Sequence, residues 1–164
     1  MSYKNSIPEK IMSREDLLRR INLWHLQNNR VVFTNGCFDL LHKGHVEYLM
    51  EAADHGDKLI IGLNSDDSVK LLNKGVNRPL QDEKARAMVL ASLTFVSAVI
   101  LFDEETPKQL IESLRPDTLV KGGDYEIHQI VGSDFVLKNG GQVKTIPIIE
   151  GYSTSNIEEK IKRF

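Results

Sequence analysis

The chain has 164 residues, 41 % of them hydrophobic, a length that suits one compact domain with a core that needs no disulfides. Lys and Arg number 21 and Asp and Glu 23, so the net charge of −2 excludes a general attraction to nucleic acid or to an anionic membrane. A single cysteine excludes an internal disulfide, and the longest apolar run, near 95–102, is too short to span a bilayer. The N-terminus lacks an apolar signal segment, so we expect a soluble cytoplasmic protein without nucleic-acid or membrane partners.

The N-terminal residues 1–12 are polar and without periodicity, and we expect them to form a loose arm. An amphipathic helix is predicted over 13–28, since Ser13 and Asp16 form a capping pattern and apolar residues, Trp24 among them, recur at helical spacing. A single domain is expected over the whole chain, with this helix as an addition at its start.

Short β-branched segments alternate with helical segments over the rest of the chain. The predicted strands span 30–35, 58–64, 97–102, 117–121 and 142–149. The predicted helices span 44–55, 66–73, 82–93, 106–114, 127–138 and 154–163. Strands joined through helices pair in parallel, so we predict a doubly wound α/β fold with a five-stranded parallel sheet, resembling a Rossmann fold. In such a sheet, ligands bind beyond the carboxyl ends of the strands.

The first predicted strand runs into TNGCFDLLHKGH, which places two histidines at the start of the next helix. Gly44 allows a ligand close to the backbone, and the amides and dipole of a helix start favour phosphate. His42 and His45 would add donors that stabilise charge during phosphoryl transfer. The alternative is that both histidines are surface or packing residues. The residues that precede the histidines make this alternative less favoured. They are the turn Thr34-Asn35-Gly36 and the loop residues Phe38 and Asp39.

The string FDLLHKGH resembles the (H/T)xGH signature of the cytidylyltransferase-like nucleotidyltransferases. The wider set is similar to one branch, the adenylyltransferase unit of bacterial ADP-heptose synthase: TNGCFDLLHKGH, GLNSDDSVK, NRPL, EKARAMVL, LVKGGDY and GYSTSNIEEKI, in order from about residue 30 to 163. The resemblance implies transfer of AMP from ATP to a sugar 1-phosphate, D-glycero-β-D-manno-heptose 1-phosphate, with Mg²⁺ and release of pyrophosphate. The product would enter lipopolysaccharide or surface-glycan synthesis.

The resemblance also assigns roles to residues. His42, His45 and Lys121 are the expected catalytic residues. The expected nucleotide-binding residues are Thr34, Asn35, Gly36, Phe38, Gly44, His45, Arg86, Gly122, Gly123, Asp124, Ser153, Thr154 and Ser155. The acceptor or a closing loop is expected to involve Asp39, Asn64, Lys74 and Arg78. Mg²⁺ would be bound mainly through the triphosphate, and no metal ligand is identified in the chain.

Structural explanations compete with several of these assignments. Asp66 or Asp67 would cap the helix after the second strand, and Arg86 would pair with Asp82 or Glu83 on its own helix. The Gly-Gly-Asp segment after Lys121 would be a plain turn, and a serine or threonine would cap the last helix.

The C-terminal motif departs from that of related branches. Some carry Arg-Thr before the serines and others an arginine after them, whereas this chain has Ile149-Glu150 and then Glu158-Glu159-Lys160. We therefore expect Arg86, Lys74 and Lys121 to carry more of the charge that holds the triphosphate.

Two other functions remain open at this stage. One is a cytidylyltransferase acting on glycerol 3-phosphate or a similar small phosphate, and the other is a nucleotide-binding sensor without turnover. A separate sugar kinase is expected to supply the acceptor. A homodimer is expected from the resemblance and from Trp24 as an apolar anchor; the alternative is that Trp24 packs within the chain.

Overall fold

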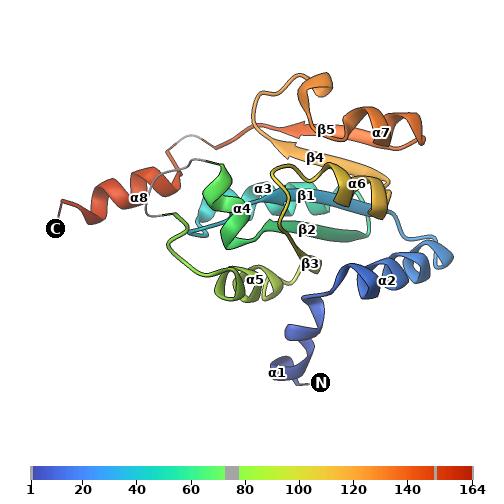
Figure 1. The fold of residues 1–164 in the computed structure, drawn as a ribbon, viewed down its shortest axis with the longest axis horizontal. Coiled ribbons are helices and arrows are strands. Elements are labelled where there is room, and N and C mark those ends of the chain that lie inside the picture. The colour runs from blue at the N-terminus through green and yellow to red at the C-terminus, as the bar shows by residue number, and fades with distance from the viewer. Residues whose placement is uncertain (1, 73–77, 150, 164) are drawn as a thin grey trace.

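The computed structural model describes residues 2–72, 78–149 and 151–163. One parallel sheet runs through the molecule in the order β3-β2-β1-β4-β5 (Figure 1). Its strands are β1 (Val31–Gly36), β2 (Lys58–Asn64), β3 (Val96–Phe102), β4 (Thr118–Gly122) and β5 (Gln142–Ile146). The predicted doubly wound α/β fold is confirmed. The strand order reverses between β1 and β4, which places a ligand site beyond the carboxyl ends of these strands.

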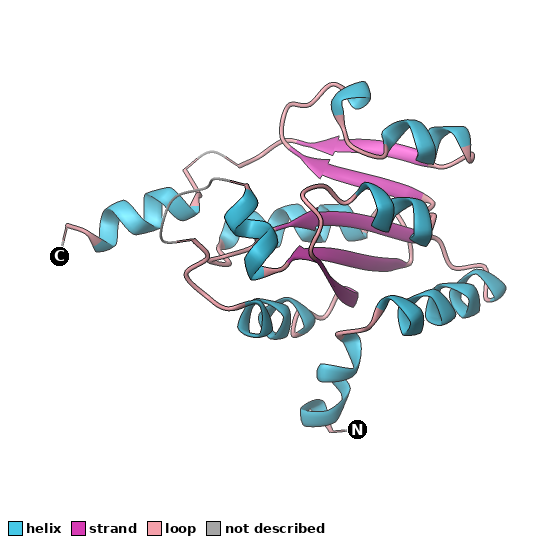
Figure 2. Ribbon diagram, viewed as in Figure 1, coloured by secondary structure: helices cyan, strands magenta, loops and turns pink. Residues whose placement is uncertain are grey.

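Helices cover both faces of the sheet (Figure 2). They are α1 (Tyr3–Ser6), α2 (Arg14–Leu26), α3 (Lys43–Ala53), α4 (Asp66–Leu71), α5 (Glu83–Ala91), α6 (Lys108–Leu114), α7 (Ser133–Lys138) and α8 (Thr154–Ile161), with 3₁₀ turns η1 (Pro8–Lys10) and η2 (Ile127–Gln129). Successive residues of β1 enter opposite cores because side chains alternate along a strand. Val31 and Phe33 pack in the core with α2, α6 and α7, whereas Val32 packs in the core with α3 and α5.

The expected loose arm is wrong for the described residues of 1–12. They form α1 and η1, and the N–H of Met12 donates to the carbonyl of Val99 on edge strand β3 at 3.0 Å. Ile7 and Ile11 pack against the core, and Lys10 Nζ donates to the carbonyl of Leu93. Partial burial of two isoleucines within a polar stretch depends on tertiary contacts and leaves no periodic pattern in the sequence.

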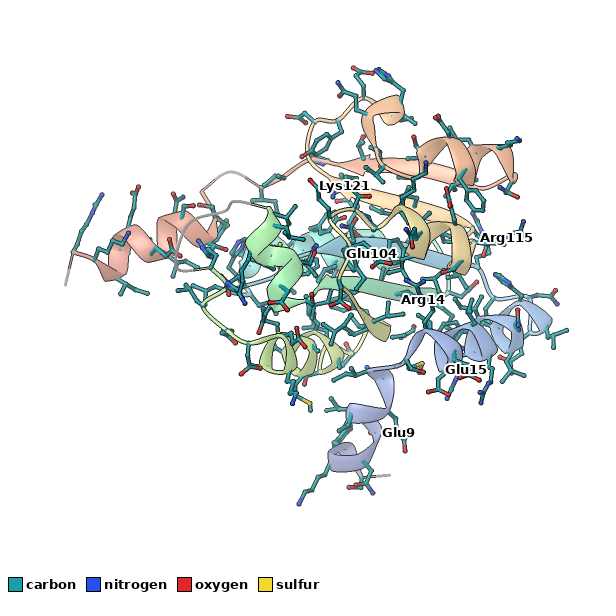
Figure 3. The ribbon with its side chains drawn as sticks, in the orientation of Figure 1. Glu9, Arg14, Glu15, Glu104, Arg115 and Lys121 are labelled. Atoms are coloured by element: carbon teal, nitrogen blue, oxygen red, sulfur yellow. The ribbon has the colours of Figure 1, made fainter. Side chains whose placement is uncertain are left out.

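The α2 helix starts at the predicted cap, where Ser13 accepts from the N–H of Asp16. Its Trp24 is 8 % exposed and packs in the core of its own chain. The anchor proposed for a dimer is therefore wrong, and the dimer itself stays a prediction. At the start of α2, Arg14 pairs with Glu104 of the β3–α6 loop at 3.1 Å (Figure 3).

Several boundaries differ from the prediction. Over 127–138 the chain forms only a 3₁₀ turn before α7, because Gly132 adopts a left-handed conformation (φ +86°) that interrupts the helix. Strand β5 ends at Ile146, before Pro147. The α4 helix is capped by Ser65, not by Asp66 or Asp67. Within the described ranges, no helix is both long and apolar enough to cross a membrane.

Candidate active site

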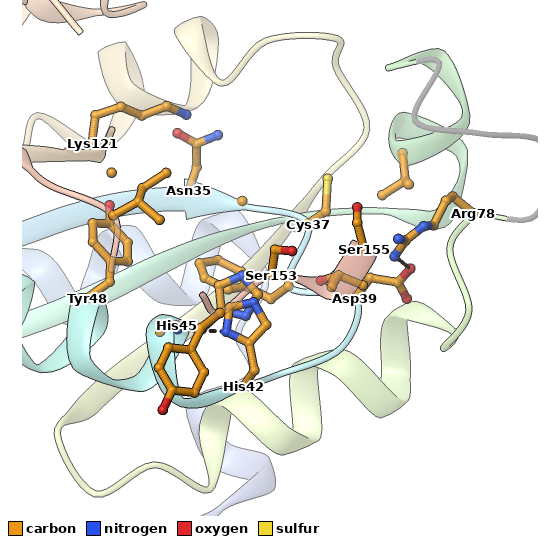
Figure 4. A pocket seen from close by; sticks show the side chains of 18 of the residues that line it. Asn35, Cys37, Asp39, His42, His45, Tyr48, Arg78, Lys121, Ser153 and Ser155 are labelled. Carbon is orange, nitrogen blue, oxygen red and sulfur yellow. Dashed lines mark hydrogen bonds and ion pairs between the residues drawn. The ribbon is translucent and has the colours of Figure 1, made fainter. Parts of the chain in front are cut away.

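A cleft of about 570 Å³ opens beyond the carboxyl ends of β1 and β4. It brings together residues from the β1–α3 loop, the start of α3, the end of β4 and the start of α8 (Figure 4). The predicted site residues that line it are Asn35, Gly36, Phe38, Asp39, His42, Gly44, His45, Arg78, Lys121, Gly122, Ser153, Thr154 and Ser155. Segments separated by more than 100 residues thus meet at the predicted edge of the sheet.

The two histidines stack at the start of α3. Nδ1 of His42 accepts from the backbone N–H of His45 at 3.3 Å and thereby caps the helix. The ring centroids lie 3.8 Å apart with an interplanar angle of 19°. Burial lowers the pKa of His42 from its usual 6.5. The neutral ring with Nδ1 as acceptor carries its proton on Nε2, so at neutral pH His42 offers one N–H donor besides the cap.

Gly44 lies between the histidines and is buried in the first turn of α3. A Cβ at this position would lie 3.1 Å from Cβ of Tyr152 and 3.2 Å from Nδ1 of His42. A glycine therefore allows the imidazole and Tyr152 to approach the helix start. The N–H groups of His45 and Val46 already donate to His42, so an anion at this helix start would meet the amides of Lys43 and Gly44.

The β1–α3 loop is fixed by aromatic contacts. Phe38 adopts a positive φ of 44°, is 7 % exposed and meets the ring of His45 edge-on at 5.3 Å. A Cβ on Gly36 would lie 2.9 Å from the Phe38 ring. The contact with Phe38 thus fixes the orientation of the His45 ring.

Thr34 was expected around the phosphates, but the structure places it beneath the cleft. Its side chain is fully buried, and its hydroxyl shares a 2.5 Å hydrogen bond with that of Tyr48, which also donates to the carbonyl of Val120. Burial raises the pKa of Tyr48 to about 12, so this hydroxyl stays protonated and joins α3 to β1 and β4. Thr34 therefore supports the site without lining it.

Asp39 and Arg78 form an ion pair at one end of the cleft (Figure 4). Oδ2 of Asp39 lies 2.7 Å from Nη1 of Arg78, and the carboxylate also accepts from the backbone N–H of Leu80 and Gln81. Burial alone would raise the pKa of Asp39, but these hydrogen bonds outweigh it and the pKa is lowered. Asp39 is thus a permanent anion that orients Arg78.

Arg86 corrects a prediction, because the structure places it outside the cleft. Its side chain is fully buried, and it donates from Nε to the carbonyl of Gln81 and from Nη1 to the carbonyls of Cys37 and Asn64. Nη2 pairs with Asp66 at 2.6 Å, so the partner is neither Asp82 nor Glu83. Arg86 holds together the ends of β1 and β2 and does not line the region expected to receive the triphosphate.

A second cavity of about 300 Å³ adjoins the first at the end of β1. Asn35, Gly36, Cys37, Lys121 and Tyr125 line both cavities. The second one also takes in polar groups from the end of β2, the β3–α6 loop and η2, namely Asn64, Glu105, Thr106 and Gln129. Asn64 donates to Ser68 Oγ at 2.9 Å and accepts from the Cys37 thiol, which fixes its amide.

The last helix brings its amino end to the cleft. Ser153 caps α8 by accepting from the N–H of Asn156, as predicted for this residue or Thr154. Tyr152 lines the cleft beside Ser153, and Lys43 Nζ lies 5.3 Å from the centroid of its ring. Hydroxyls and first-turn amides at the rim suit an anionic ligand.

Some expected site residues lie elsewhere. Gly123 and Asp124 line neither of the two cavities, and Asp124 is exposed. Lys74 lies outside the described residues. Sequence reasoning missed Tyr48 and Tyr152, which line the cleft. Tyr152 directly precedes the predicted serine motif, which is a signal for it, whereas Tyr48 is one of several aromatic residues on a helix and carries none.

The described residues offer no cage for a metal. They contain no group of three or more His, Cys, Asp or Glu side chains arranged to hold an ion. Asp39 lines the main cleft, but its oxygens already accept from Arg78 and two amides. Within 2–72, 78–149 and 151–163, the side chains thus form no ready-made set of ligands for Mg²⁺.

Known proteins with similar sequences and folds agree with this geometry. Residues 33–160 match the family model described as Cytidylyltransferase-like. The chain is 50 % identical to the bifunctional protein HldE of Azorhizobium caulinodans over 155 residues, 94 % of this chain and 32 % of that protein. It is also 50 % identical to the HldE protein of Geobacter metallireducens, with 99 % of this chain and 33 % of that protein covered. The chain thus spans about a third of the length of these curated relatives.

Solved structures extend the comparison. A lipopolysaccharide core biosynthesis protein from Thermoplasma volcanium superposes with a TM-score of 0.60 at 28 % identity, covering 76 % of this chain and 99 % of that one. Pantoate-β-alanine ligase from Francisella tularensis also gives a TM-score of 0.60, over 93 % of this chain and 76 % of that one, but at 14 % identity it shares the fold alone. With the histidine pair at the start of α3 and a family match over most of its length, the chain belongs to the cytidylyltransferase-like family.

Proposed function

We propose that this chain is a nucleotidyltransferase that transfers AMP from ATP to a sugar 1-phosphate, giving an ADP-sugar and pyrophosphate. The observation that carries the proposal is the pair of cavities that meet at the end of β1. A transferase that joins two phosphorylated substrates needs two sites whose phosphates come together, and Lys121 lines both cavities at their junction. The similarity to HldE proteins supports heptose 1-phosphate as the acceptor, in lipopolysaccharide or surface-glycan precursor synthesis.

The triphosphate fits the main cleft. The starts of α3 and α8 both face it, and each contributes backbone amides and a positive dipole end. His42 supplies an Nε2–H donor, and His45 lies against it. In the reaction, an oxygen of the acceptor phosphate attacks the α-phosphorus. The bond between the α-phosphorus and the oxygen that bridges the α- and β-phosphates breaks, and pyrophosphate leaves with the electron pair. The histidines would stabilise the charge on the α-phosphoryl oxygens.

The sugar fits the second cavity. Amide, hydroxyl and carboxylate groups line it, and these are the groups that recognise the hydroxyls of a sugar. Among the described residues that line this cavity, Lys121 is the one cation, and it lies where the acceptor phosphate would meet the α-phosphate of ATP. No covalent enzyme intermediate is needed, because the acceptor phosphate already provides a charged oxygen.

We propose that Mg²⁺ enters with the triphosphate, which is the usual arrangement for an ion that keeps several waters and binds substrate phosphates. Its role would be to neutralise phosphate charge. The acceptor also requires an earlier phosphorylation at the anomeric carbon by a sugar kinase, and a cytoplasmic homodimer remains part of the proposal.

The decisive experiment measures pyrophosphate release, coupled to pyrophosphatase, across a panel of nucleoside triphosphates and small sugar or polyol phosphates. We expect turnover with ATP and a sugar 1-phosphate. Preference for CTP and glycerol 3-phosphate would indicate the cytidylyltransferase alternative. Nucleotide binding without release for any pair would indicate a sensor.

A further inference from the structure

Arg78 lies between two carboxylates at the rim of the main cleft. Nη1 contacts Asp39 at 2.7 Å, and Nη2 contacts Glu158 of α8 at 2.6 Å. The Arg78 side chain is 15 % exposed and lines the cleft, so its guanidinium is screened from bulk water but open to a ligand. An arginine in such a place is well suited to a phosphate, because its planar donors match phosphate oxygens.

The two carboxylates differ in how firmly they are held. Asp39 is 6 % exposed and accepts from the amides of Leu80 and Gln81 as well as from Arg78. Glu158 is 26 % exposed, and its described polar contact is the one with Arg78. Asp39 is therefore a fixed partner that keeps Arg78 in place, whereas Glu158 can leave without breaking a second hydrogen bond.

The helix that carries Glu158 is itself weakly held. None of the eight residues of α8, Thr154–Ile161, is buried, and Figure 1 shows the helix pointing away from the sheet. The amino end of α8 nevertheless contributes Ser153, Thr154 and Ser155 to the cleft. The Arg78–Glu158 pair thus joins this exposed helix to the end of the cleft that Asp39 fixes.

We propose that Glu158 is an internal competitor for a substrate phosphate: in the ligand-free chain its carboxylate occupies the Nη2 edge of Arg78, and a phosphate of the bound triphosphate takes its place. The inference rests on the proposed function, because it requires a nucleoside triphosphate in the main cleft. A phosphate group carries more charge than a carboxylate and also accepts from the helix-start amides, so it wins the exchange. The exchange lowers the apparent affinity for the triphosphate and frees α8 from Arg78.

The first test compares Glu158→Gln with wild type in calorimetric binding of a non-hydrolysable ATP analogue with Mg²⁺, and of inorganic pyrophosphate with Mg²⁺. Loss of the competitor should tighten binding of each probe by about three- to tenfold. Glu159→Gln is the matched control, because Glu159 is the next residue on α8, is exposed and pairs only with Arg163 among the described residues. It removes the same charge and should leave the affinity unchanged.

A double-mutant cycle separates the ion pair from a general charge effect. Arg78→Gln should weaken binding about tenfold or more, and adding Glu158→Gln to it should give no gain, since the competitor then has nothing to block. Unchanged or weaker binding in Glu158→Gln alone would overturn the proposal, because Glu158 would then be a support for Arg78. An equal gain in the Arg78→Gln background would overturn it as well.

A second measurement needs no variant. Amide hydrogen exchange in a peptide covering 157–163, beyond the first-turn amides of α8 that would meet the phosphates, should become faster in the wild-type chain when pyrophosphate or the ATP analogue saturates the cleft, because this part of α8 loses its link to Arg78. Unchanged or slower exchange would overturn the proposal. Failure of the proposed function looks different: neither probe would bind wild type or any variant, and the inference would fall with it.

Discussion

Arg78 lies in the segment before α5 and Arg86 within α5, and in the sequence both are cations near a predicted phosphate site. The structure separates them. Arg86 is fully buried, donates to three backbone carbonyls and pairs with Asp66, whereas Arg78 lines the cleft between Asp39 and Glu158. Both guanidinium groups are paired. Arg86 bonds to groups inside the protein, whereas Arg78 bonds to carboxylates at the rim of the cleft.

The difference shows how a chain of net charge −2 divides its cations at a site for a highly charged ligand: some stabilise the protein and others remain able to bind the ligand. A buried cation bonded to carbonyls stabilises the loop that presents the ligand groups, and it is no longer available to a phosphate. A cation at the rim, balanced by carboxylates, remains exchangeable. Four predictions test this division, from the largest expected effect to the smallest.

The Arg86→Ala variant should lower the free energy of unfolding by about 3–5 kcal/mol, because it leaves Asp66 and three carbonyls without their donor. Urea unfolding measures this. Arg20→Ala, an exposed arginine on α2, is the control and should stay within about 0.5 kcal/mol of wild type. Wild-type stability combined with loss of ATP binding would restore Arg86 as a direct phosphate contact.

Replacing either histidine at the start of α3 should lower kcat by about 10²-fold or more, because in the proposed reaction each variant loses a donor to the developing phosphoryl charge. The variants are His42→Ala and His45→Ala, and the measurement is pyrophosphate release at saturating substrates. His128→Ala changes an exposed histidine outside both cavities and should retain wild-type turnover. Near-normal turnover in either site variant would contradict the proposed role.

For Lys121→Ala we expect binding of a non-hydrolysable ATP analogue to weaken by about 1.5–3 kcal/mol, the range for hydrogen bonds to charged groups. Binding of adenosine should hardly change, since it lacks the phosphates. Calorimetry with both ligands measures the difference, and Lys144→Ala on the exposed side of β5 is the control. Equal losses for both ligands would mean that Lys121 shapes the pocket instead of holding phosphate.

The smallest effect concerns pH. Burial lowers the pKa of His42 below 6.5, so the unfolded chain binds a proton more readily than the folded one. The contribution of His42 to stability is therefore present above pH 6.5 and is lost as pH falls through the lowered pKa. Urea unfolding at pH 7.5 and 5.5 should show this loss, and His42→Asn, which keeps a capping side chain, should show less of it. The same pH dependence in both proteins would contradict the assignment to His42.

Much of the fold was predictable from local pattern. Five β-branched segments separated by helical ones specify a parallel sheet, and parallel connection places every strand's carboxyl end on one edge. The cluster of Asn35, His42, Lys121 and Ser153 at that edge follows from this rule alone. The packing of the N-terminal segment was not predicted, because Ile7 and Ile11 pack against the core at the edge strand β3, which lies about 90 residues further along the chain.

The identity of the ligand-facing side chains depends on more than the pattern. The sequence by itself determined the α/β class, the edge that carries the site, the cap at Ser13, a cap at Ser153 or Thr154 and the histidine pair at a helix start, because each depends on residues close together in the chain. Only the tertiary structure decided that Arg86 faces inward and Arg78 faces the cleft. A buried guanidinium requires hydrogen-bond acceptors, and the carbonyls of Cys37 and Asn64 come within reach of Arg86 only after β1 and β2 pair.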